Sequence, residues 1–165
     1  MKVDMYAQNL VSEPRVVQYV DLSKYVGLWY EIAKIPNRFQ KHCKRSTTAQ
    51  YKFLENGKIE VINSCIDEEG ERDETKGIAK VVDKSTNAKL EVSFVSILGF
   101  NLFWGDYWII GLDTNYEYAV IGTPTRKYGW ILSRKPKLSE EKLKEVFEIL
   151  TEQGYDSQKF EFTEQ

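Results

Sequence analysis

The stretch TTAQYKFLENGKIEVINSC, residues 47–65, decides the fold of this chain. Apolar and polar side chains alternate on both sides of Asn56-Gly57, which is the pattern of two half-buried β-strands. An Asn-Gly pair between two such runs is the strongest short-range signal for a hairpin, because both residues accept positive φ angles. The stretch therefore predicts two antiparallel strands, over 47–54 and 58–65, joined by a tight turn.

Similar short strands, separated by turn signals, are predicted along most of the chain. Six further ranges show the pattern: 28–35, 75–82, 89–95, 107–112, 116–121 and 128–134. Because the resulting eight strands are joined mostly by short turns, we expect an antiparallel meander that closes into a barrel and so removes both open edges. A β-sandwich is the alternative, but Greek-key sandwiches need longer crossovers than these turns supply.

The pattern changes after Pro136. Ser139 is a suitable N-cap, and two glutamates follow in the first turn, where the helix dipole favours acidic side chains. Gly154 provides a C-terminal stop. Between them, apolar side chains repeat at helical spacing, at Leu143, Val146, Phe147 and Leu150. One apolar stripe predicts one helix packed on the outside of the barrel, and a last short strand is predicted over 159–162.

Size, charge and composition limit the class of protein. The 165 residues suit a single domain over 1–165, with an irregular arm over 1–15. The 23 basic and 25 acidic side chains form no basic stripe, so a nucleic-acid partner is not expected. Aromatic residues make up 13% of the chain, and large rings both fill cores and line cavities for apolar ligands.

The sequence shows no clear targeting signal. No apolar run is long enough to span a membrane, and no signal peptide is visible over 1–10. Either the chain is cytosolic or a leader has been removed, and the sequence leaves both open.

The cysteines and the only histidine give a weak chemical signal. Cys43 and Cys65 match no CxxC or zinc spacing, and His42 adds only one further ligand, so no metal site is expected. Either the two cysteines form a disulfide, or Cys65 points inward as a free thiol. No cofactor is expected, because the chain has no Gly-rich phosphate loop, and it has no Ser/His/Asp order.

Three motifs, in order, resemble those of the lipocalin family. GLWYE at 27–31 is similar to the Gly-x-Trp signature, DTNYEYA at 113–119 to the second motif and ILSR at 131–134 to the third. Segments 35–39, 56–63 and 103–108 look like the branch that contains bacterial lipocalins and apolipoprotein D. The resemblance implies an all-β, eight-stranded antiparallel up-and-down barrel with one C-terminal α-helix.

For function, the resemblance implies non-catalytic binding, storage or transport of a small hydrophobic ligand in the barrel. A long-chain fatty acid, a lysophospholipid or a similar lipid is expected, with a role in membrane lipid maintenance and a location in the periplasm or at the outer membrane. An N-terminal cysteine of the kind that anchors bacterial lipoproteins does not occur in this sequence.

The motif residues Gly27, Trp29, Asp113 and Arg134 are expected to be structural. The resemblance implies that Trp29 closes one end of the barrel, with Arg134 lying over its indole. A guanidinium on an aromatic face contributes about 0.5–2 kcal/mol.

Ligand-binding residues follow from the resemblance and from strand alternation. Matching residues are Tyr51, Asn63, Tyr107, Trp130 and Leu132, and alternation adds Phe53, Phe94, Ile109 and Tyr118. If Trp29 points inward, then Glu31, Ala33 and Ile35 do too. The set describes an apolar tube with a few phenol and amide groups, which suits an acyl chain with its polar head near the mouth.

Three features leave alternatives open. An inward Glu31 carboxylate is costly unless it is paired, so we expect a bond to a buried Tyr or Arg, or else a role near the ligand. A lipocalin-type enzyme that acts on a lipid-like substrate through Cys65 or Glu31 is the alternative to a carrier. The apolar segment 97–104 is either a lid that packs on the barrel or a contact with a membrane surface or a second copy in a homodimer.

Overall fold

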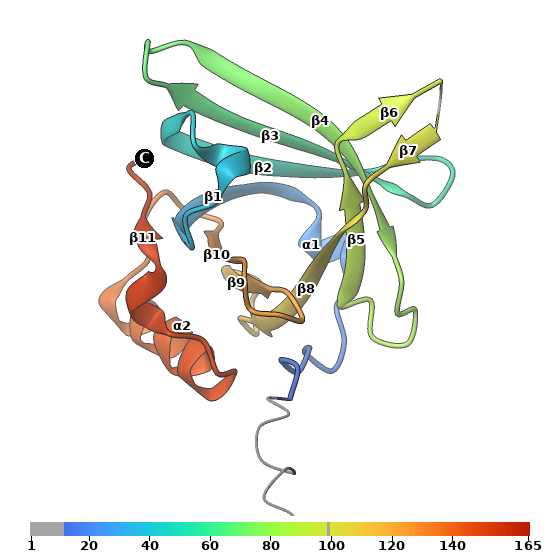
Figure 1. Cartoon of the computed structure of the whole chain (residues 1–165). Coiled ribbons are helices and arrows are strands. Elements are labelled where there is room, and N and C mark those ends of the chain that lie inside the picture. Colours follow the sequence, from blue (N-terminus) through green and yellow to red (C-terminus); the bar gives the residue numbers. More distant parts are fainter. Residues whose placement is uncertain (1–11, 99) are drawn as a thin grey trace, which may run out of the picture.

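The computed structural model describes residues 12–98 and 100–165, and its centre is one closed antiparallel barrel (Figure 1). Strand order is β10-β9-β8-β5-β4-β3-β2-β1, and β10 also pairs with β1, which closes the ring. The strands are β1 (Gly27–Lys34), β2 (Cys43–Phe53), β3 (Ile59–Asp67), β4 (Arg72–Val81), β5 (Lys89–Ser93), β8 (Gly105–Leu112), β9 (Tyr118–Gly122) and β10 (Gly129–Ser133). The predicted meander and its closure into an eight-stranded barrel are confirmed.

The hairpin around Asn56-Gly57 forms, but its turn differs from the predicted one. Only Gly57 has a positive φ, of 79°, and the backbone N–H of Leu54 donates to the carbonyl of Lys58 over 2.8 Å. The Asn56 side chain accepts from the Lys58 N–H at 3.0 Å. The turn therefore has one left-handed residue, Gly57, where the Asn-Gly signal predicted two, and the Asn56 side chain stabilises it locally.

A β-bulge in β1 changes which side chains point inward. Glu31 pairs with Leu132 but Ala33 pairs with Ile131, so Ile32 is an extra residue in β1. Ile32 and Ala33 are both buried in a cluster outside the barrel, and Ile35 packs against the same cluster. The expectation that Ala33 and Ile35 point inward with Glu31 is therefore wrong, since a bulge interrupts the two-residue alternation.

Two segments between the predicted strands contain regular structure. The segment after Pro36 folds into the 3₁₀-helix η1 (Arg38–Gln40), and β2 already begins at Cys43. Asn37 caps η1 by accepting from the Gln40 N–H at 3.1 Å. Between β5 and β8, the strands β6 (Val95–Ile97) and β7 (Phe100–Leu102) pair as a separate hairpin.

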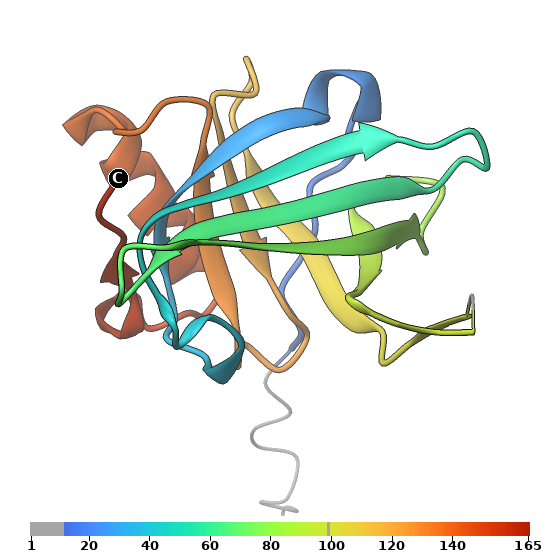
Figure 2. The ribbon, with the colours of Figure 1, turned by 90° about the horizontal axis from the view of Figure 1, so that it is seen from above.

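The single long helix, α2 (Glu140–Glu152), lies on the outside of the barrel as predicted (Figures 1 and 2). The Ser139 hydroxyl accepts from the Lys142 N–H at 3.2 Å, and Gly154 has a φ of 81° just beyond the helix. Val146 and Leu150 are fully buried. They pack with outward-facing residues of β8, β9 and β10, so α2 covers one face of the barrel.

Short elements complete the two ends. The helix α1 (Leu22–Tyr25) precedes β1, while η2 (Ser157–Lys159) and β11 (Glu161–Phe162) follow α2. β11 pairs with β1 through Ala33 and Phe162. In the part of the chain that the structure describes, the search for a helix suited to crossing a membrane found no candidate.

Candidate ligand-binding cavity

Trp29 and Arg134 close one end of the barrel. Trp29 is fully buried, and the guanidinium carbon of Arg134 lies 3.8 Å from the centroid of its indole. Arg134 also donates to the carbonyls of Lys24, Tyr25, Val26 and Leu28, over 2.6–3.1 Å. Burial lowers the pKa of Arg134 from its usual value. The arrangement is the one that the family resemblance implied for these two residues.

The other two motif residues shape the backbone at the same end. Gly27 has a φ of 109°, and a Cβ there would lie 3.3 Å from Arg134 Nη1, so glycine meets both a backbone and a space requirement. The Asp113 carboxylate accepts from the N–H groups of Asn115 and Glu117, each at 3.1 Å. Asp113 therefore holds the turn between β8 and β9.

Three tyrosine hydroxyls meet just above this plug. The Tyr107 hydroxyl lies 2.6 Å from that of Tyr25 and 2.8 Å from that of Tyr51. Burial raises the pKa of Tyr51 to about 12 and holds the pKa values of Tyr25 and Tyr107 well above their usual range. All three phenols are thus neutral hydrogen-bonding groups at the floor of the barrel.

Above the tyrosines, the barrel contains a cavity of about 590 Å³. Seven of the predicted ligand-binding residues line it: Glu31, Tyr51, Asn63, Phe94, Tyr107, Trp130 and Leu132. Further lining comes mainly from Ala49, Val61, Val92, Phe103 and Ile121, with Thr and Ser side chains between them. The volume falls within the range of about 300–1,000 Å³ that small-molecule sites occupy.

Three of the alternation candidates do not line this cavity. Phe53 is the last residue of β2, beside the turn, where its ring is exposed because no element packs over it. Tyr118 faces α2 and donates to Glu145 at 3.1 Å, since Ala119 and Ile121 are the residues of β9 that face the barrel interior. Ile109 points inward but is fully buried in the packed core.

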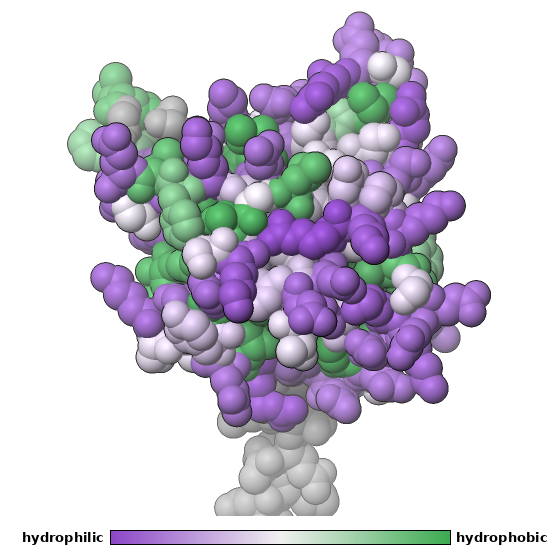
Figure 3. Space-filling model, turned by 180° about the vertical axis from the view of Figure 1, so that it is seen from behind, coloured by the Kyte–Doolittle hydropathy of each residue, from purple (hydrophilic) through white to green (hydrophobic). Residues whose placement is uncertain are grey.

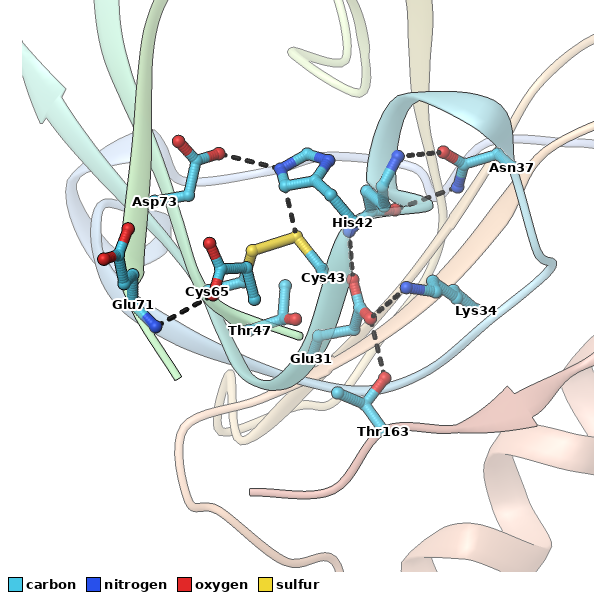
Figure 4. The surroundings of a disulfide bond; sticks show 12 residues. Glu31, Lys34, Asn37, His42, Cys43, Thr47, Cys65, Glu71, Asp73 and Thr163 are labelled. Carbon is cyan, nitrogen blue, oxygen red and sulfur yellow. Dashed lines mark hydrogen bonds and ion pairs between the residues drawn. A yellow bond between two sulfur atoms is a disulfide. The ribbon is translucent and has the colours of Figure 1, made fainter. Parts of the chain in front are cut away.

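Glu31 is the centre of a polar network on the cavity wall. Its carboxylate accepts from Gln40 Nε2 at 2.8 Å and from the Thr163 hydroxyl at 2.6 Å, and Lys34 Nζ lies 3.7 Å away (Figure 4). The buried carboxylate is therefore paired, but with these groups and not with a Tyr or an Arg. Lys34 lies on β1 itself, whereas Gln40 and Thr163 come from η1 and the C-terminal segment, which no spacing in the sequence connects to β1.

Gln40 is the functional residue that sequence reasoning missed most clearly. Its side-chain oxygen accepts from the Trp130 indole N–H and from Asn37 Nδ2, each at 2.9 Å, while its nitrogen donates to Glu31. Gln40 thereby fastens η1 to the cavity wall. Tyr128 was missed too: its ring stacks on Trp130 with 6.0 Å between centroids, and Phe39 lies 5.7 Å from Tyr128 on the other side.

Cys43 and Cys65 form a disulfide, which settles the open alternative (Figure 4). Beside it, His42 Nε2 lies 3.7 Å from Cys43 Sγ and 2.7 Å from an Asp73 carboxylate oxygen. All four residues line the cavity. The enzyme alternative that relied on a Cys65 thiol is wrong for this oxidised chain, because the sulfur is already bonded.

The rim of the cavity carries an exposed apolar tip, which we define as Phe94, Ile97, Leu98, Phe100, Leu102 and Phe103. Leu98 is 93% exposed and Phe103 81% exposed, although Phe103 also reaches the cavity. A compact apolar projection is visible over β6 and β7 in Figure 3. Most of these side chains face solvent, while Phe94 and Phe103 also line the cavity.

Comparisons with known proteins agree with this geometry. Residues 20–165 match the model of the family described as "Lipocalin-like domain". The chain is 40% identical to temperature-induced lipocalin-1 of Arabidopsis thaliana, covering 93% of this chain and 83% of that protein. It is 36% identical to the outer membrane lipoprotein Blc of Escherichia coli K12, and the match covers 91% of this chain and 82% of that protein.

An animal relative and a solved structure extend the likeness. Apolipoprotein D of Mus musculus is 38% identical, with 92% of this chain and 80% of that protein covered. The structure of insecticyanin from the tobacco hornworm Manduca sexta superposes with a TM-score of 0.75 at 25% identity, covering 93% of this chain and 84% of that one. This chain therefore belongs to the lipocalin family, whose members bind small hydrophobic ligands.

Proposed function

We propose that this protein is a non-catalytic carrier of a single-chain lipid, with lysophospholipids preferred over free fatty acids. The observation that carries the proposal is the cavity itself, which joins an apolar interior to a polar network and an aromatic group at one wall. An acyl chain would lie along the apolar wall, because burial of its methylene groups removes apolar surface from water.

The charges that line the cavity favour the head group of a lysophospholipid over the carboxylate of a fatty acid. Three carboxylates line it, those of Glu31, Asp73 and Asp106, whereas no Lys or Arg is among the lining residues that the structure describes. A free fatty-acid carboxylate would meet like charges there, and such juxtaposition is unfavourable. A phosphocholine head group has no net charge and ends in a positive trimethylammonium group, so it meets less repulsion there than a free carboxylate does.

Aromatic rings beside Glu31 suit the same head group. Phe39, Tyr128 and Trp130 all line the cavity and contact one another in sequence. Quaternary ammonium groups are recognised by such rings through cation–π attraction. We therefore propose that the choline group of a lysophosphatidylcholine lies between these rings and the Glu31 network.

A carrier fits the chemistry of the described residues better than a catalyst. Cys65 is bonded to Cys43, and the Glu31 carboxylate is held by hydrogen bonds from Gln40 and Thr163. The bonded Cys65 sulfur is not a nucleophile in this state, and the two hydrogen bonds give the Glu31 carboxylate a structural role in the cavity wall.

We further propose that the apolar tip contacts a membrane surface while lipid enters or leaves the cavity. Phe103 belongs to both the tip and the cavity lining, so the two surfaces are continuous. Exposed apolar patches mark contact sites. Because the Escherichia coli relative is named an outer membrane lipoprotein, we propose the periplasmic face of an outer membrane as the place of action.

The test is calorimetric titration of refolded, delipidated protein with lysophosphatidylcholine and with a fatty acid of the same chain length. We expect lysophosphatidylcholine to bind with a Kd about tenfold lower or better, equivalent to about 1.4 kcal/mol. Leu132→Trp should abolish binding, because the larger side chain fills the cavity. Tyr128→Leu should weaken the binding of lysophosphatidylcholine and leave the binding of the fatty acid unchanged.

The matched control is Val82→Trp, which adds the same side chain at an exposed position outside the cavity lining. Equal loss of binding in both tryptophan variants would argue against the cavity as the site. A correctly refolded protein that binds neither lipid would refute the proposed function.

A further inference from the structure

We propose that, once the Cys43–Cys65 disulfide is reduced, His42, Cys43, Cys65 and Asp73 bind a Zn²⁺ ion at the mouth of the barrel. The ion would replace the covalent link between β2 and β3 and would add β4 to the connection. This inference does not depend on the identity of the lipid, since it concerns one wall of the cavity and not its contents.

Strand register brings three of the four donors together. Cys65 on β3 lies directly opposite Asp73 on β4, so their side chains share one face of the sheet. The disulfide places Cys43 on β2 against Cys65, with 5.5 Å between their Cα atoms. Three adjacent strands therefore direct two sulfurs and a carboxylate toward one point.

His42 completes the set from the end of the loop before β2. Its Nε2 atom faces both Cys43 Sγ, at 3.7 Å, and an Asp73 oxygen, at 2.7 Å (Figure 4). The donor atoms of His42 and the two cysteines lie within 4.8 Å of one another. Zinc bonds of about 2.0–2.3 Å in a tetrahedron separate ligand atoms by roughly 3–4 Å, so small side-chain rotations suffice.

Two of the four side chains lie where they can rotate. Those of His42 and Asp73 are about half exposed, at 49% and 46%, whereas Cys65 is buried. Breaking the sulfur–sulfur bond lets the two cysteine side chains separate, while the paired strands hold their backbones. The site would therefore form without a change in the barrel.

The donor chemistry selects zinc among common divalent cations. Two thiolates, one imidazole and one carboxylate are ligands that Zn²⁺ takes in four-coordinate sites. Thiolates disfavour Mg²⁺ and Ca²⁺, which prefer sets of oxygen ligands.

The reaction needs a dithiol reductant, which we name as the co-reactant. Two electrons pass from the dithiol to the disulfide, giving two protein thiols and the oxidised, cyclic disulfide of the reductant. Zinc then displaces both thiol protons to solvent and forms two sulfur–zinc bonds. His42 binds through the Nε2 lone pair and keeps its proton on Nδ1.

The experiment uses Co²⁺ as a spectroscopic probe on the full chain, reduced with a dithiol that is then removed without oxygen. We expect one cobalt per chain, with thiolate-to-metal charge transfer and the intense visible bands of tetrahedral cobalt, and displacement by Zn²⁺. The oxidised protein should show neither the charge-transfer band nor the visible bands of tetrahedral cobalt. Circular dichroism of the reduced chain checks that the barrel stays folded.

Variants separate this site from loose binding by thiols. Replacing Cys43 and Cys65 together by Ser should remove the charge-transfer band, while His42→Ala and Asp73→Asn should each raise the Kd about tenfold or more. The matched control is Glu68→Gln, which alters an exposed acid paired with Lys44 and not with the site.

Three results would overturn the proposal. These are a reduced, folded chain without the cobalt bands; a reduced chain that unfolds, since the four donors would then not be held together; and equal affinity in Asp73→Asn and Glu68→Gln.

Discussion

The two ends of the barrel differ in how completely their side chains are packed. At the closed end, Trp29 lies buried under Arg134, and three tyrosine hydroxyls bond to one another. At the open end, the apolar tip faces solvent, and one disulfide and the Gln40 network hold the cavity wall. We therefore expect the closed end to contribute most of the stability through complete packing, whereas the open end depends on the disulfide and a few hydrogen bonds.

The largest loss is expected at the closed end. Trp29→Ala removes a fully buried indole and the partner of Arg134, so the free energy of unfolding should fall by about 3–5 kcal/mol. Denaturant titration followed by circular dichroism measures it. Leu98→Ala at the open end is the matched control and should change the value by less than about 0.5 kcal/mol. Similar losses in both variants would remove the contrast.

The disulfide should give the next effect, at the open end. Replacing Cys43 and Cys65 together by Ser frees a loop with a sequence separation of 22, which should cost about 3 kcal/mol in the chain-entropy account. The change appears as a lower denaturant midpoint in oxidising buffer. Wild-type protein in excess dithiol, with metal removed, should show the same midpoint as the double variant. An unchanged midpoint would mean that the link contributes nothing to the open end.

Alkaline pH should weaken the closed end, where three buried phenols have raised pKa values. The pKa of Tyr51 rises from 10.0 to about 12 on folding, because burial disfavours the phenolate. A raised pKa means that the folded state binds the proton more tightly, so this contribution is complete below pH 10 and lost as pH rises through about 12. The loss for Tyr51 alone is about 2–3 kcal/mol. Tyr25 and Tyr107 act in the same direction.

The measurement is the denaturant midpoint as a function of pH across that window. Tyr51→Phe should flatten the alkaline slope, since it removes one of the buried phenols. An identical slope in the variant would show that the tyrosine cluster does not control alkaline stability.

The smallest effect on stability is expected at the apolar tip. Leu98→Ser together with Phe103→Ser should leave the free energy of unfolding within about 0.5 kcal/mol, because both side chains are exposed. The same double variant should lower sedimentation with phosphatidylcholine vesicles several-fold. A shift from dimer to monomer on size-exclusion chromatography, with vesicle binding unchanged, would instead assign the tip to a second copy of the chain.

Much of the cavity lining could be predicted from the sequence, and the residues that were wrongly predicted have identifiable physical causes. Tyr51, Asn63, Tyr107, Trp130 and Leu132, which the family resemblance implied, all line it. Strand alternation added Phe94, which also lines it, because alternation along a strand is a local property. Tyr118 was misplaced because the inward face of β9 depends on its register with β8, where a bulge interrupts the pairing. Phe53 was misplaced because burial ends at the strand terminus.

Short-range periodicity and turn chemistry are enough to predict the strands, their meander and closure, and the capped outer helix. The family motifs add the packing of Arg134 on Trp29. Contacts between distant groups follow only from the folded chain: Glu31 meets Gln40 and Thr163, Cys43 meets Cys65, and Asp73 meets His42. A bulge, a strand register and a folded loop set these contacts, and none of them leaves a periodic pattern in the sequence.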